Sequence, residues 1–87
     1  MDKRKIFEST VDLMLSDDYK KRFVAEYVQT KTRYDALHGM VVKYEAGTLN
    51  FEPDCSLALL KEQKTAMGRY LYWLEVRAEV EGIPLML

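Results

Sequence analysis

The chain is poor in the residues that interrupt helices, and it has one cysteine and one histidine. Its 87 residues include four glycines and two prolines. Such scarcity favours long helices over a succession of turns. The lone cysteine, Cys55, excludes an internal disulfide and a thiolate zinc site. A protein without disulfides is typical of a reducing cytoplasm, and we expect that location here.

The chain also lacks an excess of either charge and any long apolar run. Lys and Arg number 13 and Asp and Glu 14, giving a formal net charge of −1. A duplex-binding domain of this size would be clearly basic, so we expect no binding to duplex nucleic acid. The apolar stretches are short and interrupted by charge, so we expect neither a membrane span nor a signal peptide. With 48% hydrophobic residues the chain is too apolar for a disordered tail, and we predict one domain over 1–87.

Hydrophobic spacing predicts an all-α fold with three helices, in residues 1–15, 17–46 and 55–81. Both long helices carry mostly apolar positions that alternate by three and four residues, as in a coiled-coil seam, with one interruption at Lys64 in the second. These positions are Phe23, Tyr27, Thr30, Tyr34, Leu37, Val41 and Tyr44 in the first, and Leu57, Leu60, Lys64, Met67, Leu71, Leu74 and Ala78 in the second. We expect Ser16 to cap the first long helix and Asp54 or Ser56 the second. Gly47 and Gly82 should end them.

A short connector between the two long helices predicts an antiparallel hairpin. With the bend at 47–55, facing residues have numbers that sum to about 102, and the two seams fall into register. A second apolar stripe on the last helix remains outside the seam; its members are Leu59, Ala66, Tyr70, Trp73 and Val76 or Val80. A two-helix core leaves apolar area open, so we expect this stripe to bind a second copy of the chain. We expect the apolar tail, residues 83–87, to dock.

The sequence contains no convincing catalytic or metal-binding constellation. His38 and Cys55 are 17 residues apart, about 25 Å along a helix, too far for a Cys–His pair. Glu75 and Glu79 lie one turn apart, but no histidine accompanies them as in helical metal motifs. We therefore expect no catalytic residue, no metal ion and no cofactor.

Arginines and aromatic residues favour a binding role instead. Six of the ten aromatic residues are tyrosines, whose flat faces and polar tips suit interfaces. Arg33 and Arg69 face each other in the predicted register, with aromatic rings close by. Guanidinium groups hold phosphates, and aromatic rings stack on bases. The candidate ligand-binding residues are Arg33, Tyr34, Arg69, Tyr70, Trp73 and Arg77.

A purely structural interpretation of these residues stays open. In it, Arg33 pairs with Asp35 or Gln29, and Arg77 pairs with Glu26 across the hairpin. Tyr70 and Trp73 are then core or oligomer contacts; they belong to the same apolar stripe.

Several runs of sequence resemble a family of small phage proteins. The runs are Ser16-Asp17-Asp18-Tyr19 and the residues up to 23, Arg33-Tyr34, the bend segment 43–53, and residues 66–71 and 74–83. Over residues 16–83 the chain resembles proteins of phages and prophages of gut Firmicutes that are related to a crAss-like phage protein. The resemblance implies a helical hairpin and a place in the cytoplasm of a bacterial host cell. It implies no particular functional residue, and Ser56 stands where relatives often have proline.

The phage setting suggests a counter-defence role. Some phage proteins are homo-oligomers of helical hairpins that capture cyclic nucleotide signals between protomers, and this chain is similar to them in size and plan. We expect a non-enzymatic homo-oligomer that binds and sequesters a nucleotide second messenger, an immune signal, at a pocket between protomers. The alternative is a protein–protein interaction module that inhibits or scaffolds a host or phage protein, such as a host defence protein, through its aromatic stripe.

Overall fold

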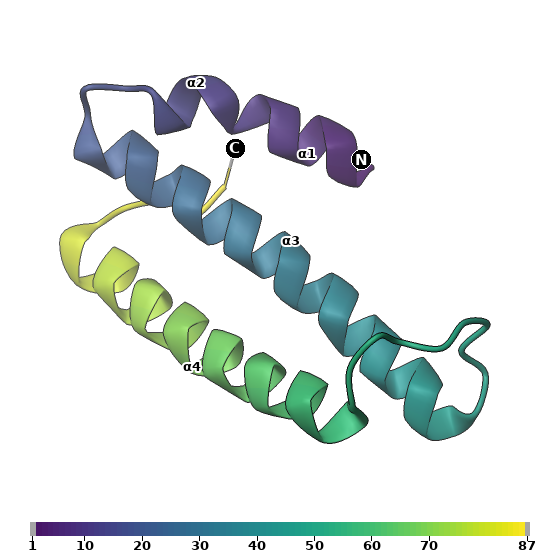
Figure 1. The fold of residues 1–87 in the computed structure, drawn as a ribbon. Coiled ribbons are helices and arrows are strands. Elements are labelled where there is room, and N and C mark those ends of the chain that lie inside the picture. The colour runs from purple at the N-terminus through teal and green to yellow at the C-terminus, as the bar shows by residue number, and fades with distance from the viewer. Residues whose placement is uncertain (1, 87) are drawn as a thin grey trace.

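The computed structural model describes residues 2–86 and confirms the all-helical fold (Figure 1). The helices are α1 (Lys3–Ser9), α2 (Val11–Met14), α3 (Tyr19–Ala46) and α4 (Leu57–Glu81), and the described range contains no strand. In Figure 1, α3 lies between α1 and α2 on one side and α4 on the other. The molecule measures 43 × 26 × 18 Å. Because α1 and α2 contact α3 but not α4, and α4 contacts α3, the described helices lie side by side in one layer.

The α3–α4 pair is an antiparallel hairpin in the predicted register. The Tyr27 hydroxyl donates to Glu75 Oε2 at 2.6 Å, and the Tyr34 ring lies against Gly68. The residue numbers of both pairs sum to 102. Every position of the two predicted seams is buried or half-buried. The most deeply buried of them are Phe23, Tyr27, Val41, Leu60, Leu71, Leu74 and Ala78.

The ends of the long helices follow local chemistry, with one correction. Gly47 and Gly82 adopt left-handed conformations, with φ of 78° and 68°, and end α3 and α4 as predicted. Ser56 caps α4 by accepting from the Leu59 amide. The prediction that Ser16 caps α3 is wrong. Asp18 caps it by accepting from the Lys20 amide, while the Ser16 hydroxyl accepts from the Asp18 amide in the preceding turn.

The expected single helix at the N-terminus is also incorrect, because the segment breaks at Thr10 into α1 and α2. The Thr10 side chain is fully buried. Its hydroxyl donates to the Phe7 carbonyl at 2.6 Å and accepts from the Gln29 amide at 2.8 Å. A contact with α3 therefore fixes the break, and the helical spacing of residues 7, 11 and 14 could not reveal it.

The C-terminal tail docks in part as predicted, through Ile83 and Leu85, whereas Met86 is 74% exposed. It leaves α4 and passes behind α3 towards α2 in the view of Figure 1. Ile83 is buried, and the half-buried Leu85 packs against the same core cluster as Phe23 and Leu74. Met1 and Leu87 lie outside the described residues.

Candidate functional site

The second apolar stripe of α4 is open to solvent. Leu59, Trp73 and Val80 are 58%, 57% and 80% exposed, and Tyr70 is 45% exposed. Trp73 also meets Tyr72 edge to face, with ring centroids 5.1 Å apart. The stripe therefore presents exposed apolar and aromatic side chains on the outer side of the hairpin.

One broad face of the hairpin collects arginines from both long helices. The Tyr19 hydroxyl donates to Glu81 at 2.9 Å, and Glu81 also accepts from Arg77 at 3.1 Å. These bonds show that the side of α3 that carries Tyr19 lies next to the side of α4 that carries Arg77 and Glu81. Residues at helical spacing along the two sides share the face; they are Arg22, Glu26 and Arg33 on α3 and Tyr70, Trp73 and Arg77 on α4. We call this surface the arginine face.

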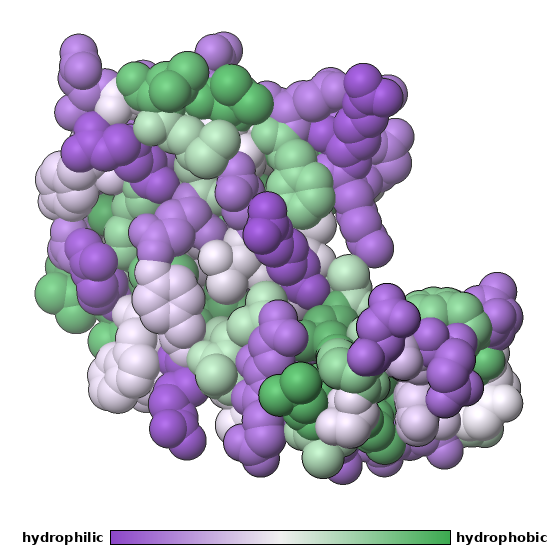
Figure 2. Space-filling model, viewed as in Figure 1, coloured by the Kyte–Doolittle hydropathy of each residue, from purple (hydrophilic) through white to green (hydrophobic). Residues whose placement is uncertain are grey.

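The arginine face lies opposite the face that the tail crosses. The tail residues Ile83 and Pro84 share a cavity with Lys20 and Val24, on the other side of α3. The arginine face is therefore turned towards the viewer in Figure 1 and in Figure 2, where hydrophilic and apolar side chains alternate across it.

A groove runs along this face between α3 and the N-terminal helices. One part has a volume of about 410 Å³ and lies beside Arg22, Glu26 and Thr30. The other, of about 590 Å³, lies beside Arg4, Phe7 and Glu8. Met14, Gln29 and Arg33 line both parts. We call the joined space the arginine groove; a nucleotide-sized ligand fits a space of this order.

Positive charge in the arginine groove is only partly neutralised. The Arg33 guanidinium lies 5.7 Å from the centroid of the Phe7 ring, and the Arg22 guanidinium donates to the Ser16 carbonyl at 2.7 Å. Neither arginine has a carboxylate within ion-pair distance among residues 2–86, whereas Arg4 pairs with Glu8 at 2.8 Å. Two guanidinium groups therefore remain available to an anionic ligand.

Arg77 is held at the edge of the arginine face by a small network. Its guanidinium lies 4.7 Å from the Phe23 ring centroid and donates to Glu81. The hydrogen bond from Tyr19, followed by that from Arg77, lowers the pKa of Glu81. The same bond to Glu81 raises the pKa of Tyr19. Glu81 is therefore a stable carboxylate that positions Arg77.

By helical spacing, four of the six predicted site residues share one broad face of the hairpin. Arg33, Tyr70, Trp73 and Arg77 lie on the arginine face. Arg33 and Tyr70 are at the same level of the hairpin, and Arg77 is seven residues further along α4, about 10 Å. On α4, Arg77 therefore shares this face with two exposed aromatic rings.

The other two predicted residues lie elsewhere. Tyr34 is half-buried in the seam, where its ring stacks with that of His38 at 6.3 Å between centroids. Arg69 is exposed on the outer side of α4. Arg33 points to Phe7 on the N-terminal side of α3, so it does not meet Arg69 across the hairpin as the register suggested.

The ion pairs of the structural interpretation do not form. Arg77 donates to Glu81 on its own helix and not to Glu26. Asp35 pairs with Lys31 at 3.0 Å, which leaves it unavailable to Arg33. The Gln29 amide donates to Thr10. In each case a partner on the same helix or on the N-terminal helices is closer than the one expected.

Three further residues, Arg22, Phe7 and Gln29, line the groove although they were not among the predicted site residues. Arg22 precedes Arg33 by 11 residues, which is about three helical turns, so the spacing alone could have predicted that the two arginines share a face of α3. Phe7 and Gln29 enter the groove only because α1 and α2 fold back on α3. Helical spacing carries no signal for that packing.

Two further classes of site are absent from residues 2–86. Within this range no three or more His, Cys, Asp or Glu residues gather in a way that could hold a metal ion. None of the helices described is both long and apolar enough to cross a bilayer.

Comparison with known proteins assigns the hairpin to a family. The Sequestin family profile matches residues 17–80, which cover α3, the connector and nearly all of α4. The chain belongs to the Sequestin family. The name of the family refers to sequestration, which is a binding activity. The match leaves out α1 and α2, so one wall of the arginine groove lies outside the family region. Neither the curated proteins nor the solved structures gave a significant match.

Proposed function

We propose that the protein is a phage counter-defence protein that binds and sequesters a nucleotide immune signal, such as a cyclic nucleotide, at the arginine face. The observation that carries the proposal is the Arg33 guanidinium, which lines a groove of nucleotide size and has no carboxylate partner among residues 2–86. Membership of the Sequestin family supports the sequestering role.

The chemistry of the face suits a phosphate-bearing ligand with a base. Arg33 and Arg77 would each bind phosphate oxygens, because a planar guanidinium donates two parallel hydrogen bonds to them. Tyr70 and Trp73 lie between the two arginines and would stack on a base. A ligand with phosphates and bases about 10 Å apart would use both ends of the face.

A second copy of the chain would cover the α4 side of the arginine face. The outer side of α4 is complementary to itself when two copies run antiparallel. In that register Leu59 meets the partner's Val80, and the small Ala66 meets the partner's Trp73. Charges match as well, because Glu62 meets the partner's Arg77. Pairing would cover the exposed stripe and bring Tyr70 and Trp73 of both copies to one pocket between protomers.

Isothermal titration tests the proposal. The purified protein is titrated with a panel of cyclic dinucleotides and related nucleotide signals, beside the variants Arg33→Ala and Arg77→Ala. We expect one ligand class to bind, and each variant to weaken it by about 10- to 100-fold, since a hydrogen bond to a charged group contributes about 1.5–3 kcal/mol.

The matched control is Lys61→Ala. It removes the same charge from an exposed side chain that pairs with Glu45, away from the groove. Binding should be unchanged in this variant. Absence of heat with every compound in the panel, or equal losses in Lys61→Ala and Arg33→Ala, contradicts the proposal.

The second candidate function is a protein-interaction module, and the exposed Tyr72–Trp73 pair favours it. Both rings are more than half exposed and meet edge to face, an arrangement common at protein interfaces. In that case the protein copurifies with a stoichiometric protein partner. Trp73→Glu would release the partner and Arg69→Ala would retain it. A nucleotide that binds the protein alone would instead favour sequestration.

A further inference from the structure

Three of the four glycines are required by the fold. Gly47 and Gly82 have positive φ at helix ends. Gly68 lies in the middle of α4, where an added Cβ would come within 3.3 Å of the Tyr34 ring. Neither a positive φ nor a close neighbour requires the fourth glycine, Gly39. It lies inside α3, and a Cβ there would meet nothing within 4 Å. Alanine would fit and is the better helix former, so the packing of this chain does not explain the glycine.

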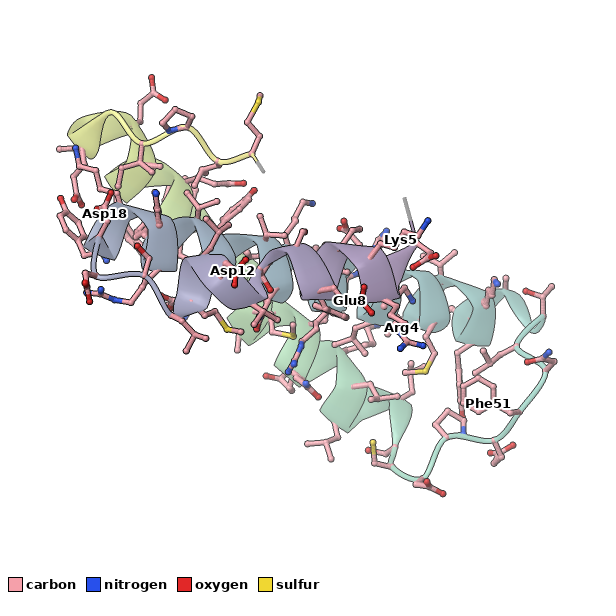
Figure 3. The ribbon with its side chains drawn as sticks, turned by 90° about the horizontal axis from the view of Figure 1, so that it is seen from above. Arg4, Lys5, Glu8, Asp12, Asp18 and Phe51 are labelled. Carbon is pink, nitrogen blue, oxygen red and sulfur yellow. The ribbon has the colours of Figure 1, made fainter. Side chains whose placement is uncertain are left out.

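Gly39 lines the wall of a cleft. The cleft has a volume of about 600 Å³ and lies between the N-terminal end of α1, the second half of α3 and the connector. Figure 2 shows the surface hollowed in this region. Figure 3 shows Phe51 on the connector loop beyond the end of α1 that carries Arg4 and Lys5. Missing a side chain, Gly39 exposes the α3 backbone at the cleft.

The cleft combines two cationic groups with apolar and amide surfaces. Lys3 and Lys43 line it from α1 and α3, and neither has a carboxylate within ion-pair distance among residues 2–86. Asp35 also lines it, but its carboxylate is paired with Lys31. Phe51 supplies an aromatic ring and Asn50 a side-chain amide.

We propose that the cleft beside Gly39 is a second binding site, for a small organic anion that carries a flat ring, of the class of aromatic phosphates. The anionic group lies between Lys3 and Lys43, and the ring packs against Phe51 and the bare backbone at Gly39. A larger side chain at position 39 would occupy the space of the ring. A volume of about 600 Å³ is in the range of small-molecule sites.

This site is independent of the arginine groove. The cleft uses the α3 positions Thr32, Gly39 and Lys43, whereas the groove uses Arg22, Glu26 and Arg33. The two sites share no lining residue, so a ligand at one can be distinguished from a ligand at the other by position.

NMR titration of the labelled full chain with adenosine 5′-monophosphate tests the proposal. We expect amide shifts at Gly39, Lys43, Asn50 and Phe51 that saturate with a single dissociation constant. In Gly39→Leu the side chain fills the cleft, and we expect the affinity to fall at least tenfold while the spectrum stays that of the folded protein.

Two variants and one ligand complete the experiment. Ala58→Leu places the same side chain at an exposed helical position outside the cleft and should bind as the wild type does. Should Gly39→Leu not fold, Lys43→Gln tests the same site by removing one cation, with a similar loss expected. Wild-type affinity in Gly39→Leu or Lys43→Gln overturns the proposal. Amide shifts confined to the arginine groove would also overturn it. The same holds if inorganic phosphate shifts the cleft amides as strongly as the nucleotide does, because the ring would then contribute nothing to binding.

Discussion

Truncation of Leu74 tests the hairpin seam. Leu74 lies on α4, is 3% exposed and packs in one cluster with Phe23, Tyr27 and Leu71. Leu74→Ala removes three carbons from this cluster and leaves a cavity between α3 and α4. The molecule is a single layer of helices, so few other side chains can move in to fill the space.

The expected loss is large for a chain of this size. A Leu→Ala change in a core costs about 2–5 kcal/mol. The whole free energy of unfolding of 87 residues is about 4–13 kcal/mol. With a denaturant slope of about 2 kcal/mol per molar urea, the midpoint should fall by about 1–2.5 M.

Urea unfolding followed by circular dichroism, at one fixed protein concentration, measures this shift. The matched control is Leu15→Ala, the same chemical change at a position that is 78% exposed. It should change the free energy of unfolding by no more than about 0.5 kcal/mol. Equal midpoints for Leu74→Ala and Leu15→Ala would refute the assigned seam.

Three further predictions concern single contacts. Burial, and then the hydrogen bond to Glu75, raise the pKa of Tyr27 to about 12. The free energy of unfolding should therefore fall between pH 10 and pH 12, with a contribution from Tyr27 of up to about 1.4 kcal/mol per pH unit. In Tyr27→Phe this decline should be shallower across the same pH series. Thr10→Val keeps the shape of a buried side chain but leaves the Gln29 amide without its Thr10 partner, and should lower the free energy of unfolding by about 1–3 kcal/mol in urea. Asp18→Ala removes the α3 cap and should cost about 1 kcal/mol, whereas Asp18→Asn should retain most of the stability in the same assay.

The hairpin was predictable because its information is local and repeated. The seam positions recur every three or four residues in both long helices, and the glycines at 47 and 82 mark the ends. A short connector then leaves one antiparallel arrangement. Each of these signals agrees with the others, which is why the register follows from the sequence.

The N-terminal helices and the candidate site were less predictable because they depend on packing between distant segments. The break at Thr10 is fixed by Gln29, 19 residues away. The direction of Arg33 depends on Phe7, which approaches it only after α1 and α2 fold back on α3. Register alone placed Arg33 opposite Arg69, because it gives the level of a residue along the hairpin but not the face on which its side chain lies.

Native mass spectrometry of the protein purified from bacteria with active immune signalling tests the sequestration claim most directly. It reports the number of copies and any bound small molecule in one spectrum. The account predicts an assembly of two or more copies that carries a nucleotide-sized adduct, and loss of that adduct in Arg33→Ala. A single unliganded copy in the wild-type spectrum would contradict it.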